Sequence, residues 1–439
     1  MDPFRTLPAP VLEMILELVD DLPALHNLHD ASPAVASLLH EDGVAPVIVE
    51  AIISRSIPWH TRHLIRRTAL IRWNADDDNG GPPVPSSWDA FVGAYMWTED
   101  DDSCRHEGDR HPLPKAIPPS IICRILSLAS KVRRLAHRCI HEMIDRCMAL
   151  EPSRLLDPTC QFRGHGGGSE PPGERFQPMD VGPPSWVEEQ RVCRAIWRLI
   201  MFFELRDAVV GTRTKQARWC WPEKDVHRLR TLQYDDFWKP SVSACVHQMH
   251  ELKTVAECLF SLTSPAATAS TDRYPCFLST TSTTTTTTTP AEKSSRVCSR
   301  CPPTFEPKPA RERTWGQSEH DLNWSGSPGF HFVVLNLGGI PQSHLRYVEL
   351  RVFRRFGFAI WDWRRMEALG FLKAPSGNRD EEEEGGEGES HPNAPVSESD
   401  AYFRWRSILT EAELEEVKRR RKHYWPSYDT IVPIPDLFG

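Results

Sequence analysis

The run His165-Gly166-Gly167-Gly168 is one stretch whose residue types could support catalysis. Some esterases place an HGGG loop beside the reacting carbonyl, where backbone amides bind the oxyanion. That chemistry also needs a nucleophilic serine in a G-x-S-x-G turn between a strand and a helix. The sequence contains no such turn. We therefore interpret the run as a flexible loop.

Cys298 and Cys301 form a CxxC pair, which supplies half of the ligands of a structural zinc site. Such a site needs four ligands, and no second CxxC pair occurs in the sequence. The spacing of the cysteines therefore predicts no metal site, and no other pattern implies a cofactor.

Further motifs that would indicate catalysis or ligand binding are incomplete. The acidic run at residues 76–79 begins like a calcium loop, but Ser87 stands where the final glutamate would be. The segment HEMID at residues 141–145 lacks the second histidine of a metalloprotease helix. There is no Walker lysine motif and no GxGxxG after a strand. The sequence therefore predicts a protein that is not an enzyme.

The composition excludes some partners. The formal net charge is −8, which argues against a strongly basic surface for nucleic acid. Apolar residues make up 40% of the chain, enough for a sizeable core, and its 439 residues allow two or three domains. The 38 prolines and 24 glycines fall largely between helix-like segments, which indicates long linkers.

Neither a signal peptide nor a membrane span is expected. The start MDPFRTLP has an acid at position 2 and only one arginine, and Glu13, Glu17 and Asp20 interrupt the apolar stretch that follows it. The apolar run at residues 330–337 is far shorter than the roughly 20 residues that cross a bilayer. Twelve scattered cysteines are typical of reduced thiols. We expect an intracellular protein, cytoplasmic or nuclear, that does not bind membranes.

The elements that position any functional residue are predicted to be helices. Near the start, Val11, Leu12, Ile15, Leu16 and Val19 recur with helical period. Pro8, Pro23 and the pair Ser32-Pro33 are typical of helix starts. Later helices are predicted at about residues 44–55, 60–73, 88–96, 119–150, 185–207, 221–232 and 241–262, with two more between residues 347 and 372.

No strand alternation of any length and no repeat period are evident, so the fold class is mainly α, an irregular helical body with disordered linkers. The predicted organisation is an N-terminal helical module at 1–56, a helical body at 57–262, a disordered Thr/Ser/Pro-rich linker at 263–327, a helical segment at 328–374, an acidic linker at 375–398, and a C-terminal helix and tail at 399–439.

The C-terminal helix ends in the basic run Lys418 to Lys422. Thr410 and Glu413 have the spacing of a capping box at its start. Cations at a helix C-terminus favour the helix dipole, which explains the basic run without a partner. A nuclear-import signal or a phosphate contact is the alternative.

The opening helices also carry the pattern Leu7, Pro8, Val11, Leu12, Ile15, Leu16, Leu25 and Leu28. Over about residues 4 to 51 this pattern resembles the F-box, the short module by which substrate receptors dock onto the Skp-type adaptor of cullin-RING (SCF-type) ubiquitin ligases. The resemblance implies that these residues contact the adaptor.

Other segments are similar to a large set of fungal F-box-like proteins of unassigned substrate. They are LDPTCQFRGHGG (156–167), EEQRVCRAIWRLIMFFELRDAV (188–209), DDFWK (235–239) and FGFAIWDWRRMEALGF (356–371). The resemblance implies a non-enzymatic adaptor, a candidate substrate receptor of the ligase that also binds an unknown protein substrate.

The alternative is a helical structural or interaction protein without a ligase link. In that case the F-box-like segment is degenerate and folds into the core. The two hypotheses differ in burial, because an adaptor-binding helix leaves apolar side chains exposed when it is alone, whereas a core helix buries them.

Overall fold

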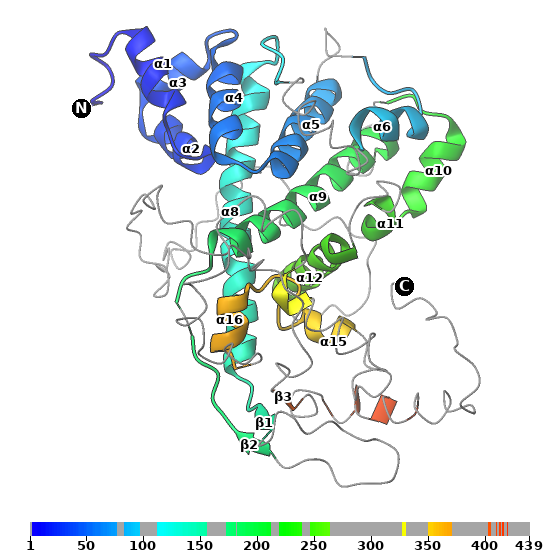
Figure 1. The fold of residues 1–439 in the computed structure, drawn as a ribbon. Helices are drawn as coiled ribbons and strands as arrows, with labels where there is room; N and C mark the ends of the chain where they lie inside the picture. Colours follow the sequence, from blue (N-terminus) through cyan, green and yellow to red (C-terminus); the bar gives the residue numbers. More distant parts are fainter. Residues whose placement is uncertain are drawn as a thin grey trace, which may run out of the picture. The chain divides into compact units, whose positions relative to one another are not determined.

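The computed structural model describes residues 2–76, 83–96, 112–155, 173–180, 182–211, 219–238, 246–263, 327–330, 350–370 and 403–404, together with residues 410, 412, 413, 415, 416 and 419. These residues are mainly helical, which confirms the predicted fold class (Figure 1). The chain divides into two compact units, Met1–Arg138 with Val192–Ser282, and Cys139–Arg191 with Thr283–Gly439.

The first unit opens with short helices. They are α1 (Ala9–Glu17), α2 (Leu22–Ala31), α3 (Pro33–Leu39) and α4 (Val44–Ser56). The side chain of Asp21 accepts a hydrogen bond from the Ala24 amide at 2.7 Å, and the Ser32 hydroxyl accepts one from the Val35 amide at 3.1 Å. Both contacts satisfy amides that have no partner inside a helix. The predicted starts at Pro23 and Ser32-Pro33 are thus confirmed to within one residue.

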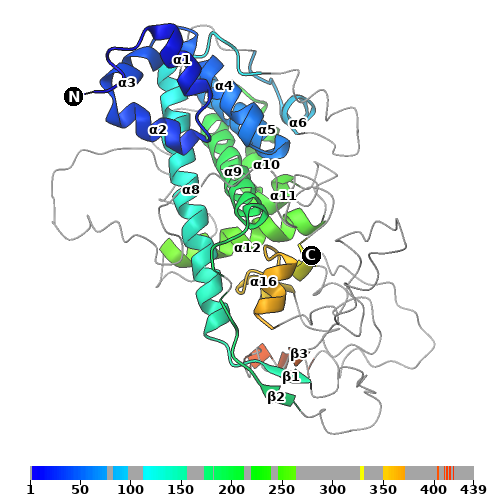
Figure 2. The same ribbon diagram turned by 60° about the vertical axis from the view of Figure 1, so that its left-hand side comes forward.

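The same unit continues through further helices of 5 to 30 residues. They are α5 (Trp59–Asp76), α6 (Trp88–Tyr95), the first part of α8 (Pro119–Met148), most of α9 (Trp186–Val210), α10 (Glu223–Thr231), α11 (Tyr234–Trp238) and α12 (Val246–Thr263). Figures 1 and 2 both place α1 to α4 around the beginning of α8. The broad apolar stripe of α8 is buried, including Ile122, Ile125 and Val132.

Aromatic residues fill the core where α6, α9 and α11 meet. The rings of Trp88 and Phe237 lie 5.6 Å apart edge to face, and those of Phe202 and Phe237 lie 5.1 Å apart. The Trp221 indole donates a hydrogen bond of 2.6 Å to the Pro85 carbonyl oxygen. Buried aromatic rings favour such tilted geometries, and a buried indole needs an acceptor. The aromatic residues described in this region are therefore core residues.

The second unit contains the end of α8, the start of α9, and two short helices, α15 (Leu350–Arg354) and α16 (Trp363–Ala368). Glu188, at the start of α9, is fully buried. Its carboxylate accepts hydrogen bonds from the Arg365 side chain at 2.9 and 3.0 Å and from the Asp362 amide at 3.1 Å. The charge of Glu188 is thereby compensated, as burial requires.

Glu188 also forms a capping box with Ser185 at the start of α9. The Ser185 amide donates to the Glu188 carboxylate at 2.9 Å, and the Glu188 amide donates to the Ser185 hydroxyl at 3.3 Å. The predicted box of Thr410 and Glu413 forms in the same way, with distances of 2.8 and 3.3 Å. Both confirm the reciprocal pattern expected from the spacing.

A small sheet in the second unit was not expected from the sequence. Its strands β1 (Ser153–Leu155), β2 (Gly173–Arg175) and β3 (Phe403–Arg404) pair antiparallel in the order β2-β1-β3. Strands of two or three residues are too short to show the alternation by which a strand is recognised.

Several predicted features lie outside the described residues. They are the HGGG run, the CxxC pair, residues 264–326 of the first linker, the whole acidic linker and all of the basic C-terminal run except Arg419. The predicted domain boundaries at residues 56, 262 and 374 stay predictions.

Candidate functional site

Helix α1 buries one of its faces. Leu12 and Leu16, one helical turn apart, are 3% and 0% exposed. Helix α1 packs against α3 and α4, which bring Leu38, Leu39 and Ile48 into the same core. Of the residues that the sequence assigned to adaptor contact, Leu12, Leu16 and Leu25 are therefore buried in the isolated chain.

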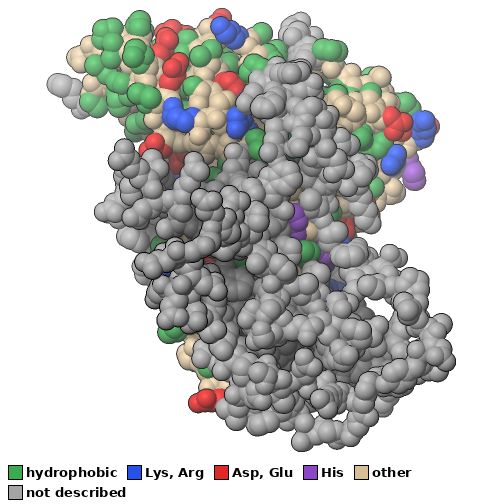
Figure 3. Space-filling view, viewed as in Figure 1, with side chains coloured by type: hydrophobic (Ala, Val, Ile, Leu, Met, Phe, Trp, Pro, Cys, Tyr) green, Lys and Arg blue, Asp and Glu red, His purple; other side chains and the backbone are tan. Residues whose placement is uncertain are grey.

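The neighbouring face of α1 is apolar and open to solvent. Val11 is 43% exposed, Met14 65%, Ile15 38% and Leu18, the residue that ends the helix, 70%. Figure 3 shows hydrophobic side chains gathered over this corner of the first unit. We call these four residues the α1 stripe. Such a continuous row of exposed apolar side chains is unusual on a soluble surface and is typical of an interaction site.

The spacing of the α1 stripe has a specific meaning. Its members stand at positions i, i+3, i+4 and i+7 of one helix, which is the pattern of anchors that a helix places in the groove of a partner. Met14 and Leu18 were not among the predicted site residues. The sequence signal that could have found them is the i, i+3, i+4, i+7 spacing counted from Val11, whereas the same spacing counted from Leu12 includes neither residue.

The remaining predicted contacts differ in exposure. Pro8 is exposed before the first turn of α1, and Leu7 is half-buried next to it. Leu28 of α2 is also half-buried. The structure thus places Pro8, Val11 and Ile15 on the open surface and leaves Leu7 and Leu28 half-buried.

The α1 stripe is held in place by polar contacts at the end of the helix. The Arg55 guanidinium of α4 donates hydrogen bonds of 2.6 Å to the carbonyl oxygens of Glu17 and Val19. A cation at this position satisfies the free carbonyls and favours the helix dipole. Arg133 of α8 forms an ion pair with Asp21, just after α1. The stripe is therefore presented on a fixed helix.

Hydrogen bonds also connect the N-terminal segment to the start of α3. Asp2 accepts hydrogen bonds from the Ser32 hydroxyl at 2.8 Å and the Ala34 amide at 3.0 Å. The hydrogen bond from the Ala34 amide is the main cause that lowers the pKa of the Asp2 carboxyl. Desolvation of the carboxyl raises its pKa by less. The carboxylate thus lies at the start of α3, where the helix dipole favours negative charge.

Charged side chains flank the α1 stripe, with the exposed Arg55 guanidinium at the end of the helix. Glu13 and Glu17 are half-buried on a third face of α1, and Asp20 is exposed just after the helix. An apolar centre with a polar rim is the usual anatomy of a protein–protein interface.

A second concentration of polar residues lies in the core between α5, α9 and α12. Arg194 donates a hydrogen bond of 2.7 Å to Glu251, and both side chains are almost fully buried. Burial lowers the pKa of His60 well below its ordinary value, and the charges of Arg194 and Arg198 lower it further. His60 is therefore neutral at physiological pH. We interpret this cluster as a link between the three helices.

One group of side chains in the described part of the chain has the chemistry of metal ligands. It consists of His29, His40 and Cys123. His141, from the incomplete HEMID motif, lies half-buried on α8.

Comparison with known proteins gives no relative. No family model matches the sequence, and no similar curated protein or solved structure was found. Among the described residues, no helix is both long enough and apolar enough to cross a bilayer.

Proposed function

We propose that the chain is a non-enzymatic adaptor that binds a Skp-type protein through the α1 stripe, as a substrate receptor of a cullin-RING ubiquitin ligase. The observation that carries this proposal is the exposure of Val11, Met14, Ile15 and Leu18 at helix-in-groove spacing. The resemblance of residues 4 to 51 to the F-box supplies the identity of the partner. An intracellular location, cytoplasmic or nuclear, follows from that partner.

The burial of Leu12, Leu16 and Leu25 favours the second hypothesis in part. These leucines behave as ordinary core residues, as expected of a helical interaction protein without a ligase link. That hypothesis leaves the α1 stripe to a different partner. The two therefore differ in which protein the stripe binds.

Co-purification of the tagged chain with a fungal Skp-type adaptor tests the proposal. The test variant is Met14→Asp with Leu18→Asp, which places charge in the exposed stripe and leaves the core intact. Met179→Asp is the matched control, because Met179 is also 65% exposed and belongs to the second unit. We expect the adaptor to co-purify with the wild type and the control but not with the double variant. Equal recovery from all three chains, or none from the wild type, would exclude the proposal.

A further inference from the structure

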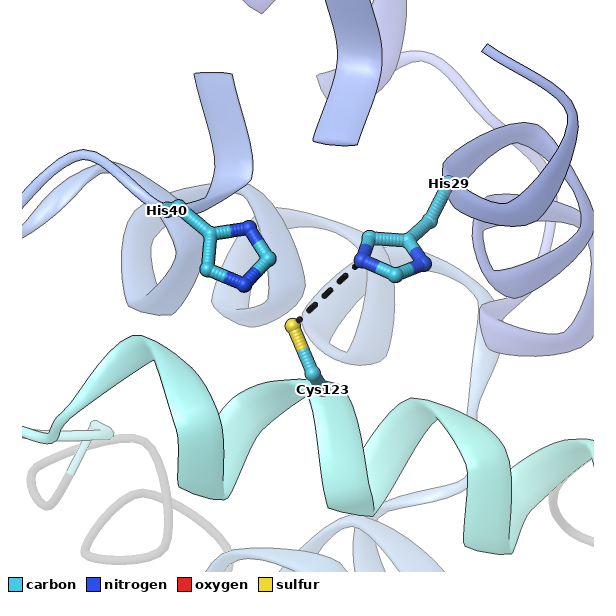
Figure 4. A group of neighbouring side chains, drawn as sticks. All are labelled: His29, His40 and Cys123. Atoms are coloured by element: carbon cyan, nitrogen blue, oxygen red, sulfur yellow. Dashed lines mark hydrogen bonds between the residues drawn. The ribbon is translucent and has the colours of Figure 1, made fainter. Parts of the chain in front are cut away.

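Two histidines and a cysteine from separate helices converge in the first unit (Figure 4). His29 lies in α2, His40 ends α3, and Cys123 lies in the first turns of α8. The Nε2 atom of His29 is 3.8 Å from Sγ of Cys123. One ligand atom from each side chain lies within 4.8 Å of both others.

The other nitrogen of each histidine ring is already committed to an oxygen atom. Nδ1 of His29 lies 3.0 Å from a carboxylate oxygen of Asp30, and Nδ1 of His40 lies 2.7 Å from the carbonyl oxygen of Ala36. Both oxygens only accept hydrogen bonds, so each Nδ1 carries the proton. The lone pair of each ring is therefore on Nε2. Metal-binding histidines are usually oriented by such a bond from the second nitrogen.

We propose that His29, His40 and Cys123 bind a divalent transition-metal ion, of which zinc fits the donors best. Two imidazoles and a thiolate are ligands that zinc accepts in tetrahedral sites. At normal bond lengths a tetrahedral zinc ion holds its nitrogen and sulfur ligands about 3.5 Å apart. The separation of 3.8 Å between His29 and Cys123 is close to that value. The fourth position is open to water.

Binding exchanges a proton for the metal. Without metal the Cys123 thiol lies 3.8 Å from Nε2 of His29 and donates a hydrogen bond to it. The ion displaces this proton and bonds to the thiolate and to both Nε2 atoms. One proton is released for each ion bound. His40 is exposed and gives the ion a path into the site.

The bound ion would fasten α2 and α3 to α8. These helices belong to the module that presents the α1 stripe, but metal binding does not depend on adaptor binding. A thiol–imidazole hydrogen bond, together with the stacking of His29 on His40 at 5.8 Å, would also bring the three side chains together without metal. The two possibilities differ in whether Cys123 becomes a metal thiolate.

Titration of the full-length chain with Co²⁺ distinguishes them. The reference chain carries Cys298→Ser and Cys301→Ser, which removes the CxxC pair as a competing ligand. We expect a sulfur-to-cobalt charge-transfer band and four-coordinate d–d bands, both removed by excess Zn²⁺. Adding Cys123→Ser or His40→Gln should abolish the charge-transfer band or weaken binding at least tenfold. Cys220 is exposed, and Cys220→Ser is the matched control. This control should leave the charge-transfer band and the affinity for Co²⁺ unchanged.

Two further readouts keep the test independent of folding. Zn²⁺ should raise the melting temperature of the reference chain but not of the Cys123→Ser chain, whose metal-free melting should match the reference. Asp30→Asn should weaken Co²⁺ binding about 10- to 100-fold, as for other residues that orient a ligand. A cobalt spectrum that Cys123→Ser leaves unaltered, or no thiolate band in the reference chain, would overturn the proposal.

Discussion

Leu16 and Leu18 stand two residues apart at the end of α1, and their environments are opposite: Leu16 is 0% exposed and Leu18 is 70% exposed. The helix therefore uses one apolar face to join the core and leaves another uncovered. The proposed function depends on this division. The buried leucines fix the helix, and the α1 stripe is available to a partner.

The two faces should respond differently to the same kind of substitution. Leu16→Ala should lower the free energy of unfolding by about 2–5 kcal/mol, because it removes buried methyl groups and leaves a cavity. Leu18→Ala should change it by less than about 0.5 kcal/mol, as for most surface positions. Urea denaturation followed by circular dichroism measures both. Equal losses from the two variants would show that α1 does not have one buried and one open face.

The ion pair between Arg194 and Glu251 should be sensitive to the loss of one partner. Glu251→Ala removes the carboxylate that pairs with the buried Arg194 guanidinium and should cost about 3–5 kcal/mol of unfolding free energy. The double variant Arg194→Met with Glu251→Leu should cost less than Glu251→Ala, because both charges of the pair are removed together. Thermal and urea denaturation test this ordering. A double variant that is less stable than Glu251→Ala would contradict it.

Glu50 should make stability depend on pH in the acidic range. Its burial alone would raise the pKa of the carboxyl, but hydrogen bonds from Arg66 and from the Leu113 amide, the latter 3.0 Å long, hold the pKa below its ordinary value. The unfolded chain therefore binds the proton more tightly than the folded chain does. The stabilisation from Glu50 is present above the ordinary carboxyl pKa and is lost as the pH falls through the lower folded value.

Glu50→Gln isolates this contribution. The variant should be less stable than the wild type at neutral pH, and the difference should shrink as the pH is lowered toward about 3. Urea denaturation of both proteins over a pH series measures it. Asp89→Asn on α6 is an exposed control for the removal of a carboxylate. A difference for Glu50→Gln that grows at low pH would mean that the pKa is raised.

Much of the helical structure could be predicted from local sequence. The prediction for residues 119–150 matches α8 at Pro119–Met148 because a long apolar stripe has a clear period. The caps at Ser32 and Ser185 were predictable because capping depends on residues only three positions apart. Both signals are contained within one element.

The two candidate sites depend on packing between elements. Helix α1 is apolar around much of its circumference, so its period alone could not show that Leu12 turns inward while Met14 stays exposed. His29, His40 and Cys123 are far apart in the chain and follow no ligand spacing, so only the packing of α2 and α3 on α8 brings them together.

Calorimetric titration of the purified chain with a purified fungal Skp-type adaptor tests the central claim most directly. The wild type and Met179→Asp should bind with the same Kd, and Met14→Asp with Leu18→Asp should weaken binding at least about a hundredfold, as expected when two anchor residues are lost. The melting temperatures of all three chains should agree. Binding of equal strength by the double variant and the wild type, or no binding by the wild type, would contradict the account.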